Sequence, residues 1–131
     1  MKKILLDTNA YTKLLLGDEI ILNALAKADK IYISTISLGE LFAGFKEGIK
    51  EKENKKLLEK FLGKPQVEVI DVDKETAEIF GEIKYKLIKI GKPLPINDVW
   101  IAACAIEEGA VIVTYDKHFI SVPGARVWDS L

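Results

Sequence analysis

Four acidic residues stand where apolar segments of the sequence end or where helices are expected to begin. Asp7 follows the apolar run Ile4 to Leu6, and Asp116 follows VIVTY. Glu40 comes early in the segment after a second β-rich run, and Asp98 opens the segment before a fourth. In an open α/β sheet, ligands bind beyond the carboxyl ends of the strands, so these strand-edge acids are predicted to share one edge of the sheet.

Carboxylates gathered at one edge repel one another, and no lysine or arginine occupies a matching strand-end position to neutralise them. Such a group either holds protons at raised pKa or binds a cation. Oxygen ligands without a cluster of cysteine or histidine favour a hard ion, Mg²⁺ or Mn²⁺, over zinc. A hard ion can activate water and offset the charge of a phosphodiester, which would let a protein of net charge −1 engage a polyanion.

Three of the strand-edge acids also have a purely structural interpretation. Ser37 and Glu40 fit a capping box, in which the glutamate accepts a hydrogen bond from the amide of the cap residue. Asp98 in a first helical turn is favoured by the helix dipole whether or not it binds an ion. Asp116 can begin the turn TYDKH.

Asp7 is harder to explain by local structure. It can cap the helix that follows it, through Thr8 or Asn9. A loop in the middle of a sheet offers little water, however, and an unpaired charge there is costly. A ligand role therefore explains Asp7 better than a cap does.

Three other features have ordinary explanations. His118, the sole histidine, fits a surface turn better than a metal site. The stretch Lys46 to Lys64 could contact RNA phosphates, but Glu51 and Lys55, four residues apart, are typical of a solvated helix face. Six apolar residues exceed what one covering layer needs, so they indicate either core packing or a dimer or partner surface: Phe42, Phe45, Leu57, Leu58, Phe61 and Leu62.

Short β-rich runs and helical segments alternate along the chain. The predicted strands are Ile4 to Leu6, Ile31 to Ser34, Val67 to Ile70, Val111 to Thr114 and, more weakly, Arg126 to Trp128. Apolar residues repeat with helical period from Leu38 to Ile49 and from Thr76 to Ile90. Strands that alternate with helices and are apolar on both faces predict a three-layer α/β/α domain with a central parallel sheet.

Helix ends are predicted from residues that favour caps. The N-terminal signals are Asp18, Ser37, Asp73, and Asn97 or Asp98. Gly109 is predicted to end the last helix, because glycine adopts the backbone conformation that follows many helices.

The composition limits the kind of protein further. With 131 residues, 49% of them hydrophobic, the chain is expected to form one domain over residues 1–131 without disulfides or a structural metal. The sole cysteine, Cys104, rules out an intramolecular disulfide and favours a cytoplasmic protein. No apolar run reaches the roughly 20 residues of a membrane span. The net charge of −1 gives no overall attraction to nucleic acid.

Four motifs, LLDTNAY, STISLGELFAG, NDVWIAACA and VIVTYDKHF, together span nearly the whole chain. In this order they resemble the PIN-domain ribonucleases, especially the short VapC-type toxins of toxin–antitoxin pairs. The resemblance implies a parallel sheet of about five strands in the order 3-2-1-4-5. It also implies that the strand-edge acids form a catalytic quartet that binds Mg²⁺ or Mn²⁺, with Asp7 and Asp98 as the core ligands and Glu40 and Asp116 completing the site.

The same resemblance assigns supporting roles, a reaction and partners. Thr114 matches a hydroxyl residue two places before the last acid, and Thr8 and Asn9 match polar positions beside the first. The implied reaction is endonucleolytic hydrolysis of RNA, in which water activated by the metal attacks phosphorus and leaves a 5′-phosphate and a 3′-hydroxyl. The implied partners are a second copy of the chain and a small antitoxin whose tail enters the acidic cleft.

Three other functions fit parts of the pattern. A phosphotransferase of the haloacid-dehalogenase type needs a second aspartate two residues after the first, where this chain has Asn9. A receiver domain needs a lysine after a late strand opposite an aspartate of the middle strand, which Lys117 beside Asp116 does not match. The main alternative is a PIN-like binding or scaffold module that cuts nothing, although the complete quartet disfavours it.

Overall fold

The computed structural model describes residues 2–128, and a five-stranded parallel sheet lies at its centre. The strand order is β3-β2-β1-β4-β5, so the first strand is central, as predicted. The bounds are β1 (Lys3–Leu6), β2 (Lys30–Ser34), β3 (Val67–Ile70), β4 (Val111–Val113) and β5 (Arg126–Val127). Each of the five predicted strands is confirmed to within one residue at either end. In register, Ile4 of β1 lies opposite Ile31 of β2 and Val111 of β4.

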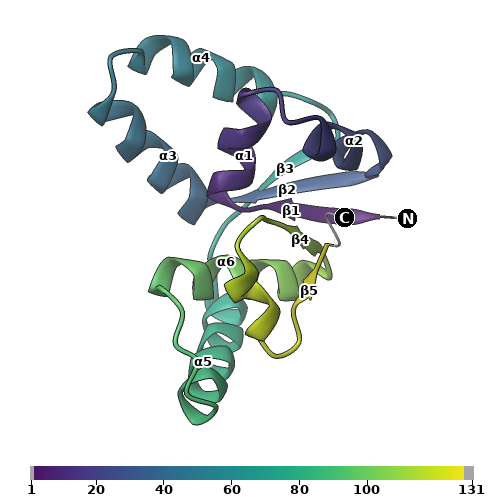
Figure 1. The fold of residues 1–131 in the computed structure, drawn as a ribbon, viewed down its shortest axis with the longest axis vertical. Helices are drawn as coiled ribbons and strands as arrows, with labels where there is room; N and C mark the ends of the chain where they lie inside the picture. Colours follow the sequence, from purple (N-terminus) through teal and green to yellow (C-terminus); the bar gives the residue numbers. More distant parts are fainter. Residues whose placement is uncertain (1, 129–131) are drawn as a thin grey trace.

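Helices cover both faces of the sheet (Figure 1). Within residues 2–128 they are α1 (Thr8–Leu15), α2 (Glu19–Lys27), α3 (Thr35–Glu47), α4 (Glu51–Leu62), α5 (Lys74–Lys89), α6 (Ile96–Glu108) and the short 3₁₀ helix η1 (Lys117–Ser121). Figure 1 shows α1 to α4 on one side of the sheet and α5 and α6 on the other. The predicted three-layer arrangement is therefore confirmed.

Successive side chains of β1 point to opposite faces of the sheet and belong to two separate cores. Ile4 and Leu6 pack among buried residues of α1 to α4, including Tyr11 and Leu58. Leu5 points the other way, into the core formed with α5 and α6. From Ile4 to Leu6 the central strand is therefore apolar on both faces, and Asp7 follows directly at its carboxyl end.

Three of the predicted helix signals are confirmed. Asp18 caps α2 and Asp73 caps α5, where Asp73 and Thr76 exchange hydrogen bonds in a capping box. Gly109 ends α6 with a φ of 66°, a conformation that glycine adopts without strain.

Two predicted helix starts are wrong. Helix α3 begins at Thr35 rather than after Ser37, because Ser34, the last residue of β2, caps it by accepting from the Ser37 amide at 3.1 Å. Helix α6 begins at Ile96 with Pro95 as its cap residue, two or three residues before the expected cap at Asn97 or Asp98. The carbonyl of Pro95 accepts from the Asp98 amide at 3.0 Å, and the fixed φ of proline prepares this start.

The apolar residues of α3 and α4 lie partly in the core and partly on the surface. Phe45, Leu58 and Phe61 are buried, whereas Phe42 and Leu57 are 38% and 45% exposed. The charged face of α4 carries the predicted ion pair of Glu51 with Lys55, at 3.2 Å, and a second pair of Glu51 with Lys46.

None of the helices within residues 2–128 is long and apolar enough to cross a membrane.

Candidate active site

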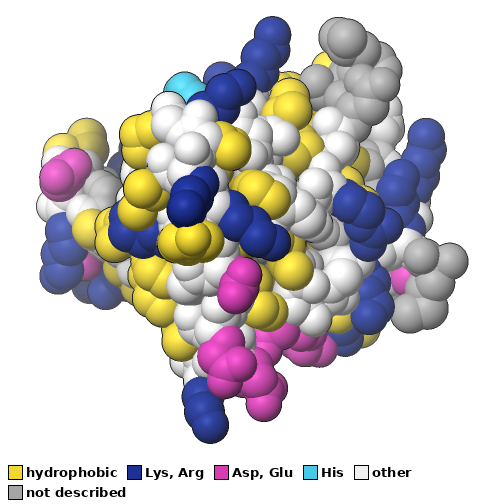
Figure 2. Space-filling view, turned by 90° about the horizontal axis from the view of Figure 1, so that it is seen from below, with side chains coloured by type: hydrophobic (Ala, Val, Ile, Leu, Met, Phe, Trp, Pro, Cys, Tyr) yellow, Lys and Arg dark blue, Asp and Glu magenta, His cyan; other side chains and the backbone are white. Residues whose placement is uncertain are grey.

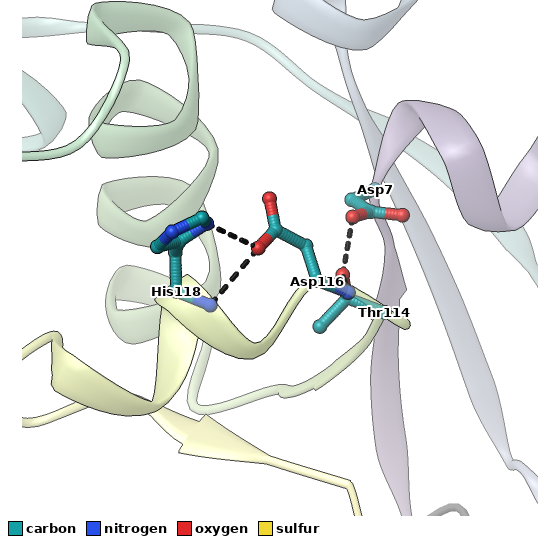
Figure 3. Close-up of polar contacts among 4 residues, drawn as sticks. All are labelled: Asp7, Thr114, Asp116 and His118. Carbon is teal, nitrogen blue, oxygen red and sulfur yellow. Dashed lines mark hydrogen bonds and ion pairs between the residues drawn. The ribbon is translucent and has the colours of Figure 1, made fainter.

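Asp7 lies at the junction of β1 and α1 and is only 4% exposed. One of its carboxylate oxygens accepts from the Ala10 amide at 2.8 Å, which caps α1, and the other accepts from the Thr114 hydroxyl at 2.5 Å (Figure 3). The cap interpretation is therefore correct, although the amide is that of Ala10 rather than of Thr8 or Asn9. Burial raises the pKa of Asp7 despite both hydrogen bonds, and the charges of Asp116 and Glu40 raise it further.

The segment after β4 carries Asp116 up to the end of β1. The Thr114 hydroxyl, which donates to Asp7, also accepts from the Asp116 amide at 2.9 Å. The Asp116 carboxylate in turn caps η1, accepting from the His118 amide at 2.9 Å and contacting its ring Nδ1 at 2.7 Å (Figure 3). The predicted turn is confirmed. The ring contact of His118 was missed, because the histidine was interpreted as a surface residue only.

Glu40 projects from α3 toward two other helices. It accepts from the Thr8 hydroxyl of α1 at 2.5 Å and from the side-chain amide of Asn97 in α6 at 3.3 Å. The predicted capping box with Ser37 is wrong, because the Ser37 amide is already bound by Ser34. The Glu40 carboxylate thus belongs to the junction of three helices at the edge of the sheet.

Asp98 lies in the first turn of α6, and its pKa is raised to about 6. Burial is the largest cause, followed by the negative charges of the other three strand-edge acids, Asp116, Glu40 and Asp7. The His118 charge is the one opposing influence among these causes. Asp116 and Glu40 are therefore close enough to disfavour ionisation of both Asp7 and Asp98, and no lysine or arginine is among the groups that offset this effect.

Comparison with known proteins identifies this arrangement. The family description "PIN domain" matches residues 4–125. The chain is 35% identical to Ribonuclease VapC2 of Rickettsia felis over 111 residues, which cover 82% of this chain and 81% of that protein. It is 31% identical to the tRNA(fMet)-specific endonuclease VapC of Salmonella typhimurium, with 98% of each chain covered. The chain belongs to the PIN-domain family, among the VapC ribonucleases.

Solved structures of VapC relatives agree over the full length. The VapBC2 complex of R. felis, bound to a DNA fragment from its promoter, contains a chain that superposes with a TM-score of 0.84 at 32% identity, covering 97% of this chain and 99% of that one. DNA-bound VapBC of S. typhimurium gives a TM-score of 0.85 at 30% identity, with both chains fully covered.

Two polar residues with predicted supporting roles, Thr8 and Asn9, follow Asp7 at the start of α1. The Thr8 hydroxyl donates to Glu40, whereas the hydrogen-bond partners of Asp7 are Ala10 and Thr114. Asn9 is exposed on α1. The contact of Thr8 is therefore with a second acid of the site, and the role of Asn9 stays a prediction.

A second group of carboxylates lies at the other end of α6. The oxygens of these helix-end acids, Asp73, Glu75 and Glu107, come within 4.8 Å of one another, the one such group among the described residues. The buried hydroxyl of Thr76 contacts both Asp73, at 2.9 Å, and Glu107, at 2.5 Å. The pKa of Asp73 is lowered, chiefly by the Thr76 amide, so its charge is already stabilised.

The donor set of the strand-edge acids fits a divalent cation. It consists of carboxylate oxygens, which suit hard ions. Two of the carboxyl groups, those of Asp7 and Asp98, have raised pKa values. A bound cation would compensate for the lost hydration, which is the largest cause of the raised pKa values, and would offset the repulsion by the neighbouring acids. The edge of the sheet in this VapC protein therefore has the chemistry of a metal site.

Proposed function

We propose that this protein is a Mg²⁺- or Mn²⁺-dependent endoribonuclease and the toxin of a toxin–antitoxin pair. The observation that carries the proposal is the accumulation of unneutralised carboxylates at the carboxyl edge of the sheet, where the pKa of Asp98 is about 6 and that of Asp7 is raised. Membership of the VapC ribonucleases supports RNA as the substrate.

In the proposed mechanism, each acid is held by a different part of the chain. Asp7 and Asp98 would hold the ion, and the Thr114 hydroxyl fixes the orientation of Asp7. Glu40 and Asp116 would complete the site. When bound, the ion supplies a lowered pKa for water and a positive charge facing the phosphate.

Hydrogen bonds orient the two outer acids before any substrate arrives. Thr8 and Asn97 hold Glu40, and His118 holds Asp116. At neutral pH Asp98 is mostly ionised, because its pKa of about 6 lies below 7. No side chain is required as a nucleophile, so the chain contributes positioning and charge rather than a covalent intermediate.

The test is cleavage of RNA by the purified protein with Mg²⁺ or Mn²⁺ and with excess EDTA. We expect cleavage with either ion and none in EDTA, and the products should carry 5′-phosphate and 3′-hydroxyl ends. Full activity in EDTA would contradict the proposal. A protein that binds RNA or the ion and never cleaves would instead be the binding or scaffold module, which the complete set of acids disfavours.

The antitoxin of the pair is proposed to dock beside Glu40. A groove of about 460 Å³ between α1, α3 and α4 runs up to Thr8 and Glu40 and is otherwise largely apolar, with Leu15 and Leu57 more than two-fifths exposed. The VapBC structures contain both components of their pairs, which supports a bound antitoxin here. Leu57→Asp should abolish copurification with the product of a neighbouring short reading frame; unchanged copurification would contradict this site.

A homodimer is proposed through the face formed by α5 and the start of α6. Figure 2, which views the molecule from the α5 side, shows hydrophobic side chains gathered on this face among lysines. Tyr85, Ile88, Ile90 and Ile96 are each more than half exposed. Light scattering should give twice the mass of one chain, and Ile88→Lys should lower it. A monomer at all workable concentrations would contradict the dimer.

The proposed activity also requires a location where RNA is present. The single cysteine, Cys104, is buried as a free thiol. A cytoplasmic location is consistent with this thiol and with the proposed RNA substrate. Cell fractionation after expression from the native gene should recover the protein with the cytoplasmic fraction.

A further inference from the structure

A second groove adjoins the strand-edge acids and, unlike the first, is lined by a lysine. It has a volume of about 420 Å³ and lies between α1 and the segment after β4, and its lining is Asn9, Thr12, Lys13, Leu16, Tyr115 and Asp116. Because Asp116 is one of the four acids, the groove leads directly away from the site of the proposed reaction. Its polar side chains and one cation suit a nucleic acid better than an apolar peptide.

Lys13 supplies a positive charge to this groove. It is exposed and lies one helical turn beyond Asn9 on the same flank of α1. It takes part in none of the ion pairs found within residues 2–128. The nearby Asp18 accepts hydrogen bonds from the Ile21 amide and the Tyr115 hydroxyl, and Lys13 lowers the pKa of Asp18 only as the smallest of several causes. The Lys13 ammonium is thus available to a phosphate.

Tyr115 supplies an aromatic ring whose position is fixed from two directions. Its hydroxyl donates to the Asp18 carboxylate, with oxygen–oxygen distances of 2.8 and 3.0 Å. Its ring packs against Trp128 with the centroids 5.5 Å apart. The ring is still 39% exposed and lines the groove. A fixed and exposed ring can stack on a base with little loss of side-chain entropy.

We propose that this groove binds the nucleotide next to the scissile phosphate in a single-stranded segment of RNA. The base stacks on Tyr115, and the flanking phosphate contacts Lys13. This inference rests on the proposed ribonuclease function and adds to it the residues that select and hold the strand. Lys13 would also offset part of the repulsion between the RNA backbone and the strand-edge acids.

Binding and its salt dependence test the two contacts separately. Affinity for a short fluorescein-labelled single-stranded RNA is measured by anisotropy in EDTA, where the proposed cleavage cannot proceed. We expect Tyr115→Leu to weaken binding about tenfold without changing the salt slope, and Tyr115→Phe to remain within about twofold of the wild type. Lys13→Gln should reduce the slope of log affinity against log salt by about 0.7, the value for one phosphate contact on a single strand.

Matched controls lie elsewhere on the surface. Phe42→Leu removes an aromatic ring of α3 that is 38% exposed, close to the 39% of Tyr115, and Lys60→Gln removes an exposed lysine of α4. Both should bind RNA as the wild type does. If Tyr115→Leu and Lys13→Gln bind RNA as these controls do, while the wild-type protein cleaves RNA with Mg²⁺, the proposed nucleotide groove is wrong and the proposed ribonuclease function stands.

Two further results would overturn the proposal. If Tyr115→Phe binds as weakly as Tyr115→Leu, the bond to Asp18 matters rather than the ring, and stacking is wrong. If the wild-type protein neither binds nor cleaves RNA, the proposed ribonuclease function fails together with this inference.

Discussion

The two groups of carboxylates in this protein differ in what stabilises their charge. The helix-end acids bring their oxygens within 4.8 Å of one another, yet the pKa of Asp73 is lowered because it caps α5 and contacts Thr76. The strand-edge acids stand farther apart, but burial and mutual repulsion raise the pKa of Asp7 and Asp98. Proximity alone therefore does not mark a cation site. Charge that the protein leaves unneutralised is the better sign.

The contrast has a local cause in each case. A helix N-terminus provides amides that stabilise a carboxylate such as Asp73. Asp7 also caps a helix, but it does so from the end of a buried strand, where the loss of hydration outweighs its two hydrogen bonds. The same cap motif therefore lowers the pKa of one aspartate and fails to lower that of the other.

The largest predicted effect is on RNA cleavage. Asp7→Asn should lower the cleavage rate about 100-fold or more, because it removes a charged ligand whose effect on the transition state is worth several kcal/mol. The fold should persist, since an asparagine oxygen can still accept from the Ala10 amide. The matched change among the helix-end acids, Asp73→Asn, should leave the rate unchanged. Equal losses in both variants would break the comparison.

A smaller effect on RNA cleavage is expected from removing the threonine hydroxyl that donates to the strand-edge acids. Thr114→Val leaves one oxygen of the buried Asp7 without its donor, a change worth about 1–3 kcal/mol. This raises the pKa of Asp7 further, so cleavage at pH 7 should fall about tenfold and recover partly as the pH rises. Thr76→Val is the control, because it removes the corresponding buried hydroxyl between Asp73 and Glu107. A pH profile of Thr114→Val parallel to that of the wild type would contradict the role given to the hydroxyl.

The pH dependence of metal binding tests the same charges through stability. At pH 5 Asp98 is mostly protonated, because its pKa is about 6, and at pH 7.5 it is ionised. Protons and the ion compete for it, so Mg²⁺ at about ten times its dissociation constant should stabilise the protein by about 1.4 kcal/mol at pH 7.5 and by less at pH 5. Thermal unfolding at the two pH values measures the difference. Equal stabilisation at both would show that Asp98 is not a ligand.

The smallest predicted effect concerns the protein without metal. A carboxyl group whose pKa is raised on folding favours the folded state below its unfolded pKa, and that contribution is lost as the pH rises through about 6. At pH 7.5 the ionised Asp98 carboxylate therefore destabilises the folded state. Asp98→Asn removes this charge and should stabilise the metal-free protein at pH 7.5 by about 1 kcal/mol, allowing for the partial exposure of the side chain. Chemical denaturation in EDTA measures this. Asp73→Ala should instead destabilise it through loss of a helix cap; destabilisation by Asp98→Asn would contradict the account.

The sequence was sufficient for the sheet and for the neighbourhood of the acids. Strand β1 is apolar on both faces and ends at Asp7, so local pattern alone placed this aspartate at the edge where ligands bind. The family resemblance indicated Thr114 as a supporting residue, but only the structure shows that its hydroxyl donates to Asp7, 107 positions away.

The predictions that failed concern residues with two equally good local explanations. Ser34 and Ser37 both fit a helix cap, and only the structure shows that the last residue of β2 serves as the cap. Glu40 matched a capping box three residues after Ser37, yet its partners, Thr8 and Asn97, belong to distant parts of the chain. Contacts of this kind depend on how α1, α3 and α6 meet, which sequence spacing does not encode.

The most direct test of the central claim is the position of a bound ion. Crystals soaked in Mn²⁺ should show an anomalous peak within coordination distance of the Asp7 and Asp98 carboxylates and none among the helix-end acids. A peak confined to Asp73, Glu75 and Glu107, or no peak at Asp7 and Asp98 at saturating Mn²⁺, would contradict it.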